Sequence, residues 1–340
     1  MMNNPASDTA VSPHQSRALP IALATAALLV LPWLVTNDYY LRIIVLSGFY
    51  IVLAVSLNIT TGFTGLLSVG HAAFFGIGAY ITALLTVGAE WSFWPAFLLS
   101  AAASAAVGAA LGFVSIRLRG DYLAIATICF AEVLRLLALN WISVTRGPMG
   151  VPGIPAPRLF GVSLDSQQAF YYLIGVAVVL VIYTAHVIQA SPFGRALFAL
   201  RDNEMAAEAM GIDTRLYKVA AFTTGAMFAG LAGSLYAPWL TFISPDNFSY
   251  LESVMILCML IVGGLGNIWG VAFGAVLLTF SLEILRPFET FRMAIYGALL
   301  VALMIYRPQG LFGNLGWKAL RQNIGSRFGK GRGPAREPTP

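Results

Sequence analysis

The sequence is poor in charged residues, cysteine and histidine. Only 10% of its 340 residues are charged, and it contains two cysteines and three histidines. Zinc and iron–sulfur sites need several clustered ligands. Here Cys129, Cys258 and the histidines are scattered, and no HExxH or CxxC spacing occurs. The sequence therefore argues against a metalloenzyme, and we interpret both cysteines as small apolar packing residues.

A phosphate-binding loop is also absent. No G-x-x-x-x-G-K-[ST] pattern occurs, so this chain does not hydrolyse ATP itself. We find no pairing of a nucleophile with a base that would mark an active site. Little chain remains outside the long apolar runs, which leaves no room for a separate soluble catalytic domain. An enzyme within the membrane has close to no support.

What the sequence does contain is apolar residues, which make up 58% of it and give a mean hydropathy of +0.78. A helix needs roughly 20 apolar residues to cross the hydrocarbon of a bilayer. We predict an all-α integral membrane protein with about ten transmembrane helices; nine or eleven remain open because some runs are short or merge. The predicted spans are 19–35, 41–59, 66–87, 93–116, 122–141, 170–188, 219–243, 253–269, 270–285 and 293–306.

Arginine and lysine are unevenly distributed between alternate loops. Placing both termini in the cytoplasm satisfies the positive-inside rule, although the C-terminal tail supplies half of the inner basic residues. The chain then divides into a polar N-terminus at 1–18, a transmembrane domain at 19–306 and a basic tail at 307–340 that we predict to be disordered. Within the domain, 142–169 forms an outer loop and 190–218 a charged cytoplasmic segment.

The charged cytoplasmic segment interrupts the apolar sequence between Arg195 and Lys218. Its stretch from Asp202 to Met210 predicts a short helix with an apolar and a charged face, and Gly211 can end that helix in a left-handed cap. Because this segment lies on the side where ATP and soluble proteins are, it indicates that a soluble partner acts on the membrane part. The alternative is an ordinary amphipathic inner loop.

Two glycine breaks occur in corresponding positions of the two halves. One follows the second apolar run and the other the eighth, each with an Ala-Phe pair shortly beyond. In the predicted topology both face the same way, which makes the halves a parallel internal repeat. Such interruptions are typical of translocation sites in transporters, whereas the alternative is tight cytoplasmic turns between helical hairpins. The candidate hinge or path residues are Gly62, Gly65, Gly263, Gly264 and Gly266.

Isolated polar residues within the spans are further candidates, because such residues are costly in a membrane. We predict path roles for Asn58, Ser68 and His71, with a packed, satisfied histidine as the alternative for His71. Glu132 and Arg135 are three residues apart and predict a structural ion pair. No dense set of intramembrane carboxylates occurs, which argues against coupling to ions.

A small-residue spacing follows the second break. Gly266, Gly270 and Gly274 recur every four residues, a pattern that lets two membrane helices approach closely. We predict a helix-packing role for these three glycines.

Four blocks of sequence, in this order, resemble the LivM-type permeases of branched-chain amino acid ABC importers. The first begins Asn-Ile-Thr-Thr-Gly-Phe-Thr-Gly, the second reads Leu-Arg-Gly-Asp-Tyr, the third contains the charged segment and the fourth is Gly-Gly-Leu-Gly-Asn-Ile-Trp-Gly. The resemblance extends over about 41–312, which is more specific than any one motif. The blocks occupy 58–80, 118–127, 201–212 and 263–270.

The resemblance implies a set of partners. Such a permease works in a bacterial inner membrane with a sister permease, two cytoplasmic ATPases and a periplasmic binding protein, and ATP and magnesium are bound by the ATPases rather than by this chain. The charged segment would be the coupling helix that docks on an ATPase. Importer permeases carry a Glu-Ala-Ala pattern there, whereas here Met205 stands at the acidic position, which leaves open which glutamate contacts the partner. The implied coupling residues are Arg201, Asn203, Glu204, Ala206, Ala207, Glu208 and Gly211.

The sequence thus predicts the permease subunit of an ATP-driven importer, carrying branched-chain or related apolar amino acids by alternating access. An importer of urea, an amide or another small solute with the same architecture is one alternative. A self-sufficient channel or secondary carrier is the other, and it would move solute without ATP. Whether the sister permease is a different chain or a second copy is left open.

Overall fold

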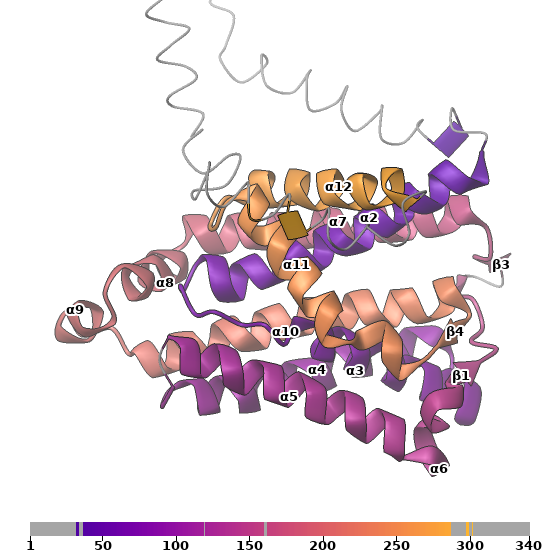
Figure 1. The fold of residues 1–340 in the computed structure, drawn as a ribbon, viewed down its shortest axis with the longest axis horizontal. Coiled ribbons are helices and arrows are strands. Elements are labelled where there is room, and N and C mark those ends of the chain that lie inside the picture. The colour runs from indigo at the N-terminus through magenta and orange to yellow at the C-terminus, as the bar shows by residue number, and fades with distance from the viewer. Residues whose placement is uncertain are drawn as a thin grey trace, which may run out of the picture.

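The computed structural model describes residues 32–33, 37–118, 120–159, 162–286, 297–298 and 301. Within these residues the protein is a bundle of helices with four strands of two residues each (Figure 1). The α- and π-helices are α2 (Asp38–Leu57), η1 (Asn58–Gly62), α3 (His71–Ala83), η2 (Leu84–Gly88), α4 (Phe93–Ser115), α5 (Asp121–Asn140), α6 (Ile142–Thr145), α7 (Gln167–Ala190), α8 (Pro192–Asp202), α9 (Glu204–Ala209), α10 (Thr214–Leu240), α11 (Tyr250–Gly263) and α12 (Ile268–Ile284). The short elements are η3 (Gly147–Met149), η4 (Pro245–Phe248), β1 (Val151–Pro152), β2 (Arg158–Leu159), β3 (Val162–Ser163) and β4 (Phe242–Ile243).

The long apolar helices of the structure agree with the prediction of a helical membrane protein. In the described residues, seven helical segments are long and apolar enough to cross a membrane, and α12 is a shorter apolar helix. The predicted runs at 19–35 and 293–306, and the terminal segments 1–18 and 307–340, lie wholly or largely outside the described residues. The total of about ten spans therefore stays a prediction.

Several predicted boundaries differ from the structure. The helix of the predicted span 66–87 starts only at His71, after a non-helical stretch. The predicted single span 253–269 is divided, since α11 ends at Gly263 and α12 begins at Ile268. Gly264 and Gly266 have φ values of +102° and +83°, which a continuing right-handed helix cannot contain. In addition, α10 begins at Thr214 because the Asp213 side chain accepts a hydrogen bond from the backbone N–H of Arg215 at 3.2 Å. The charged segment 190–218 therefore includes the first turn of α10.

The helices form two layers (Figure 1). Helices α2, α7 and α12 pack together in one layer, and α10 packs along α4 and α3 in the other. Helix α2 contacts α10, which joins the layers into one buried core. Helices α8 and α9 extend from one end of the bundle, whereas α6, β1 and β4 lie at the opposite end. The molecule thus has two distinct ends, connected by long helices.

Small residues bring α10 close to α4. A Cβ atom on Gly108 would lie 2.8 Å from the carbonyl oxygen of Phe222, and one on Gly112 would lie 2.8 Å from the Cα of Val219. Such close backbone approach gives membrane helices dispersion contacts that apolar side chains against lipid cannot supply. The contact between α4 and α10 therefore depends on the absence of side chains at these glycines.

Hydroxyl groups connect three of the helices in the interior. The Thr82 hydroxyl on α3 lies 2.6 Å from that of Ser234 on α10 and 3.1 Å from that of Ser100 on α4, and all three residues are fully buried. Hydrogen bonds between membrane helices contribute about 0.6–2 kcal/mol each. They fix the rotation of α3, α4 and α10 about their axes, which apolar packing alone specifies less well.

The predicted outer loop at 142–169 is held against the end of α10. Strand β1 pairs antiparallel with β4, with Val151 opposite Ile243. The backbone N–H of Ile154 donates to the carbonyl oxygen of Thr241 at 3.1 Å. This long connection is therefore anchored to the bundle by backbone hydrogen bonds.

We predict that Gly108→Ala destabilises the protein by about 1–3 kcal/mol, because the new methyl group forces α4 away from α10. The measurement is the thermal unfolding midpoint of the purified protein in mild detergent. Gly175→Ala on α7 is the matched control, since a Cβ there meets no atom within 4 Å. That control gains up to about 1 kcal/mol of helix propensity. Equal midpoints for the two variants would contradict the packing argument.

Candidate functional site

The charged segment folds into two short helices, each capped by a side chain. The Ser191 hydroxyl accepts from the N–H of Gly194 at 3.2 Å and starts α8, with Pro192 in its first turn. Asn203 accepts from the N–H of Ala206 at 3.1 Å and starts α9. Asn203 therefore separates the two helices and sets the direction in which α9 leaves α8.

Gly211 ends α9 in a left-handed cap, as the sequence predicts. Its φ is +84°, its N–H donates to the carbonyl oxygen of Glu208 at 2.9 Å, and the N–H of Ile212 donates to that of Ala207 at 3.0 Å. These two bonds form a Schellman motif, which favours glycine because it lacks a Cβ. The chain then turns sharply into α10.

Both glutamates of α9 bind the protein's own helix α10. The Glu204 carboxylate lies 2.7 Å from the Lys218 ammonium, and the Thr214 hydroxyl donates to Glu208 at 2.6 Å. The Lys218 side chain is only 1% exposed, so its charge depends on this partner. Sequence reasoning did not assign Lys218 or Thr214 to the site. The short spacing from Glu208 to Thr214 could have suggested one contact, but the turn that permits it is not visible from spacing.

The outer face of α9 is mainly apolar, although Glu208 is also exposed. Met205 is 68% exposed and Met210 is 83% exposed, and Ala206 is exposed between them. Leu216 at the start of α10 continues this surface at 64% exposure. Ala207 faces the other way and is buried. Met205, at the position where the resemblance implies an acidic residue, therefore belongs to a mainly apolar outer surface.

Arg201 at the end of α8 reaches both glycine breaks. Its Nη1 donates to the carbonyl oxygen of Gly62 at 2.7 Å. A Cβ on Gly65 would lie 3.1 Å from its Cγ, and one on Gly266 would lie 2.8 Å from its Nη1. A Cβ at either position would crowd this side chain, and both glycines also have a positive φ, +75° at Gly65 and +83° at Gly266. The sequence placed Arg201 beside the coupling helix but gave no sign of this long-range contact.

The two breaks are also bonded directly to each other. The N–H of Gly266 donates to the Asn58 side-chain oxygen at 2.8 Å, across 208 residues of sequence. Asn58 begins the π-helical turn η1, which ends at Gly62, and a Cβ on Gly62 would lie 2.9 Å from the nitrogen of Gly266. Single π-helical turns are frequent at functional sites. Asn58, Gly62 and Gly266 therefore form one contact region.

After the first break, backbone N–H groups of the non-helical chain donate hydrogen bonds to side-chain hydroxyls. The N–H of Leu66 donates to Thr64 at 3.1 Å and that of Val69 to Thr127 at 3.0 Å. The Ser253 hydroxyl likewise accepts from a backbone N–H, that of Ala72, at 3.0 Å. Buried backbone groups need such partners where no water reaches them. Threonine and serine thus permit an open segment between η1 and α3.

The three predicted path residues lie at this region but differ in their bonding. The His71 ring lies 2.7 Å from the Ser56 hydroxyl and is almost fully buried, which matches the alternative of a packed histidine. By contrast, the Asn58 side-chain nitrogen and the Ser68 hydroxyl are buried without a partner in the part of the chain that the structure describes. A buried polar group without a hydrogen bond costs about 1–3 kcal/mol.

The second break forms a tight hairpin between α11 and α12. Gly263 ends α11, Gly264 and Gly266 lie in the turn, and α12 begins behind Asn267. A Cβ on Gly274 would lie 2.6 Å from the carbonyl oxygen of Met259, and one on Gly263 would lie 2.5 Å from that of Gly270. Gly270 and Gly274 thus lie where the two helices meet, whereas Gly266 lies in the turn beside Asn58.

Over the described ranges, no three His, Cys, Asp or Glu side chains are grouped as metal ligands. In the described residues, side-chain contacts connect a surface helix with two interruptions of the bundle.

Comparison with known proteins identifies relatives along most of the chain. The family model "Branched-chain amino acid transport system / permease component" matches residues 39–306. The high-affinity branched-chain amino acid transport system permease protein LivM of Escherichia coli is 39% identical over 316 residues, covering 85% of this chain and 74% of that protein. LivM of Salmonella typhimurium is 40% identical over 285 residues, covering 77% and 67%. The probable branched-chain amino acid transport permease protein LivM of Methanocaldococcus jannaschii is 24% identical, covering 81% and 93%. No solved structure matches the chain significantly.

We predict that Lys218→Met destabilises the protein by about 3 kcal/mol, because it leaves the partly buried Glu204 carboxylate without its cation. Adding Glu204→Gln should recover part of this loss, with a coupling energy of about 1–3 kcal/mol. Thermal unfolding midpoints of the wild type, both single variants and the double variant measure this. Strictly additive effects would mean that the ion pair does not fasten α9 to α10.

Proposed function

The chain belongs to the family of permease components of branched-chain amino acid transport systems, and from that membership we propose that α9 couples an ATP-hydrolysing partner to the two glycine breaks. The chain is a multi-pass membrane permease of an ABC transport system and is a transport component rather than a catalytic enzyme. Its cargo is a branched-chain amino acid or a related apolar one, moved by alternating access.

The remaining parts of the system are separate proteins. Two cytoplasmic ATPases bind ATP and magnesium, a sister permease completes the path, and a periplasmic protein delivers the amino acid. This chain then lies in a bacterial inner membrane with both termini in the cytoplasm, and the end with α8 and α9 faces the ATPases. The absence of a phosphate-binding loop from its sequence supports this division of labour.

The apolar outer face of α9 is the surface that an ATPase would cover. Met205, Ala206 and Met210 present a flexible, polarisable contact area, which suits a helix that docks into a groove. Asn203 and Gly211 fix the two ends of the helix. Because Glu204 and Glu208 are already bonded to α10, their role is to hold the helix rather than to bind the partner.

The observation that carries the proposal is the contact of Arg201 with Gly62. A force on α9 passes by two routes: through Glu204 and Lys218 into α10, and through α8 and Arg201 into the breaks. Alternating access requires contacts that differ between states. The bonds of Arg201 to Gly62 and of Asn58 to Gly266 belong to the state described here. The Asn58 side-chain nitrogen and the Ser68 hydroxyl, which have no partner among the described residues, are available for hydrogen bonds in the other state.

The two breaks are the moving parts in this proposal. Gly62 and Gly65 belong to one break, and Gly263, Gly264 and Gly266 to the other, with the parallel repeat placing them at equivalent points of the two halves. Their meeting at Asn58 supports a paired hinge. His71, whose ring is hydrogen-bonded to Ser56, is a packing residue beside that hinge.

We predict that Arg201→Ala lowers ATP-dependent uptake of leucine at least about tenfold, a loss near 1.4 kcal/mol or more, while the ATPases still co-purify and hydrolyse ATP. The reason is that the docking surface is intact but its connection to Gly62 is lost. Arg195→Ala on the same helix is the control, because Arg195 is exposed and, within the part of the chain that the structure describes, its guanidinium contacts only the carbonyl oxygen of Ala190, at 3.4 Å. Equal uptake by the two variants would contradict the proposal.

We predict that Met205→Asp removes the ATPase partners from the complex purified in mild detergent, because a carboxylate is costly to bury in an apolar contact. Met149→Asp is the matched control, since Met149 is 84% exposed and lies in η3. The neighbouring elements α6 and β1 are at the end opposite α8 and α9. Retention of both ATPases by Met205→Asp would refute the assignment of this face. Loss of them from both variants would point to general misfolding, and the membrane abundance of each variant separates these results.

A further inference from the structure

A cavity of about 200 Å³ lies between α3, α5 and η4, away from the glycine breaks. Its walls are almost wholly apolar and include Ile77, Leu134 and Phe248. Pockets for drug-sized ligands occupy about 300–1,000 Å³, so this space suits a smaller molecule. An apolar cavity holds water poorly, and an apolar side chain is therefore its favoured occupant.

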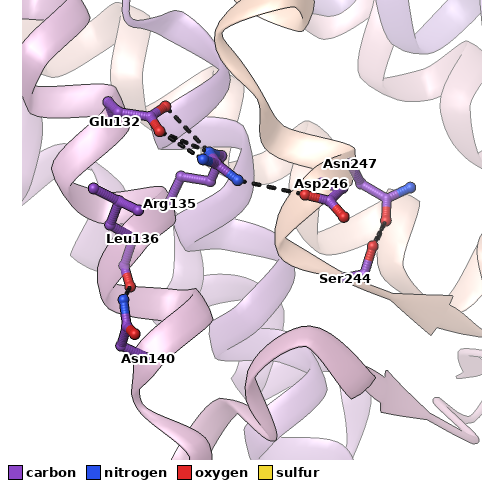
Figure 2. A network of polar contacts seen from close by, with 7 residues as sticks. All are labelled: Glu132, Arg135, Leu136, Asn140, Ser244, Asp246 and Asn247. Atoms are coloured by element: carbon purple, nitrogen blue, oxygen red, sulfur yellow. Dashed lines mark hydrogen bonds and ion pairs between the residues drawn. The ribbon is translucent and has the colours of Figure 1, made fainter.

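Charged groups stand beside this apolar space. Arg135 is the charged residue among those that line it. As Figure 2 shows, Arg135 faces Glu132 on its own helix and Asp246 in η4, which is a different element. A structural ion pair needs only one carboxylate. The second one leaves the group with a surplus negative charge, which a ligand ammonium group would neutralise.

The hydrogen bonds of Arg135 are divided unevenly between the two edges of its guanidinium. Glu132 occupies the edge formed by Nε and Nη2, with distances of 3.1 and 2.6 Å. On the other edge, the one contact of Nη1 among the described residues is a long one of 3.4 Å to Asp246, whose side chain is 82% exposed. This edge can therefore exchange Asp246 for a ligand carboxylate, which arginine binds in its planar fork.

Besides Arg135, the Tyr80 side chain brings a polar group to the wall of the cavity. Tyr80 lines it, and the Tyr80 hydroxyl is buried with no hydrogen-bond partner in the described part of the chain. Its ring packs against Phe248, with 5.9 Å between the ring centroids. A buried hydroxyl normally has a partner, and a polar group of a bound ligand would supply one.

We propose that this cavity is a binding subsite for a free amino acid with an apolar side chain. The ligand carboxylate binds Nη1 of Arg135, its ammonium group binds Asp246, and its side chain enters the cavity past Ile77. This assignment rests on the proposed transport function and deepens it by naming the residues that meet the cargo. An acyl chain of a lipid would fill the same apolar space, but it would not interact with the charges of Glu132, Arg135 and Asp246.

The position of the subsite connects it to the coupling machinery. Tyr80 and His71 lie on the same helix, α3, and nine residues separate them by roughly 14 Å at 1.5 Å per residue. The first glycine break leads directly into α3. A movement of that break therefore shifts one wall of the cavity relative to α5, which changes the contacts that an amino acid makes there.

The test uses the complete transporter with all its partner subunits, in proteoliposomes, and labelled leucine and valine in the same vesicles. Ile77→Trp fills the cavity and should lower leucine uptake at least five times more than valine uptake, because leucine has the larger side chain. Ile125→Trp on the exposed face of α5 is the matched control and should leave the ratio unchanged. A ratio measured within one preparation does not depend on the amount of folded protein.

A second variant tests the charged groups. Arg135→Gln should lower the uptake of both amino acids at least tenfold while the ATPases remain bound. Arg286→Gln is the control, because Arg286 forms the same kind of i, i+3 pair with Glu283 outside the cavity, at 3.1 Å.

Two results would overturn the proposal. The first is an unchanged leucine-to-valine ratio in Ile77→Trp; a lipid that co-purifies with the wild type and is lost from this variant would then identify the occupant as lipid. The second is equal uptake by Arg135→Gln and Arg286→Gln. If the wild-type transporter itself carried neither amino acid, the proposed function would fail, and the subsite would fail with it.

Discussion

Buried backbone groups must have hydrogen-bond partners, and this constraint shapes the region where the helices are interrupted. The chain leaves helical geometry after Gly62 and again after Gly263. The backbone groups there lose their helical hydrogen bonds and need other partners. Threonine and serine hydroxyls satisfy the first interruption, and Asn58 satisfies the N–H of Gly266 in the second. Neither break is complete without groups from elsewhere in the chain. The two breaks are therefore bonded to each other because their backbone groups need hydrogen-bond partners.

Helix α10 turns these local contacts into a larger unit. It receives α9 through Lys218 and Thr214 at one end, and along its length it packs closely on α4 and α3. Its hydroxyl contacts with Thr82 fix α3 in rotation. The first break leads into α3. A displacement of α9 therefore reaches α3 by two connected routes, one through α10 and one through Arg201. A rigid connection by both routes makes partial movement costly, because close-packed interiors do not deform continuously.

Local sequence signals predicted local structure well. The left-handed cap at Gly211, the helical pairing of Glu132 with Arg135 and most of the long apolar helices follow from spacing and from residue type. The contacts that make the candidate site were not predictable in this way. Arg201 with Gly62 and Asn58 with Gly266 join residues 139 and 208 positions apart. Their formation depends on how two layers of helices stack, which hydrophobic periodicity does not determine.

Two ion-paired groups of the molecule differ. The Lys218 pair holds two helices together, whereas the Arg135 group is suited to binding a ligand. Lys218 is nearly inaccessible and its ammonium lies 2.7 Å from one carboxylate, so the pair is closed. Arg135 has two carboxylates, one of them contributed by η4, and one edge of its guanidinium is only weakly bonded. This group has one more carboxylate than cation, and Asp246 is 82% exposed, so the surplus negative charge is accessible to a ligand as well as to water. Such a group beside an apolar cavity fits the proposed recognition site better than a pair that only supports the helix carrying it.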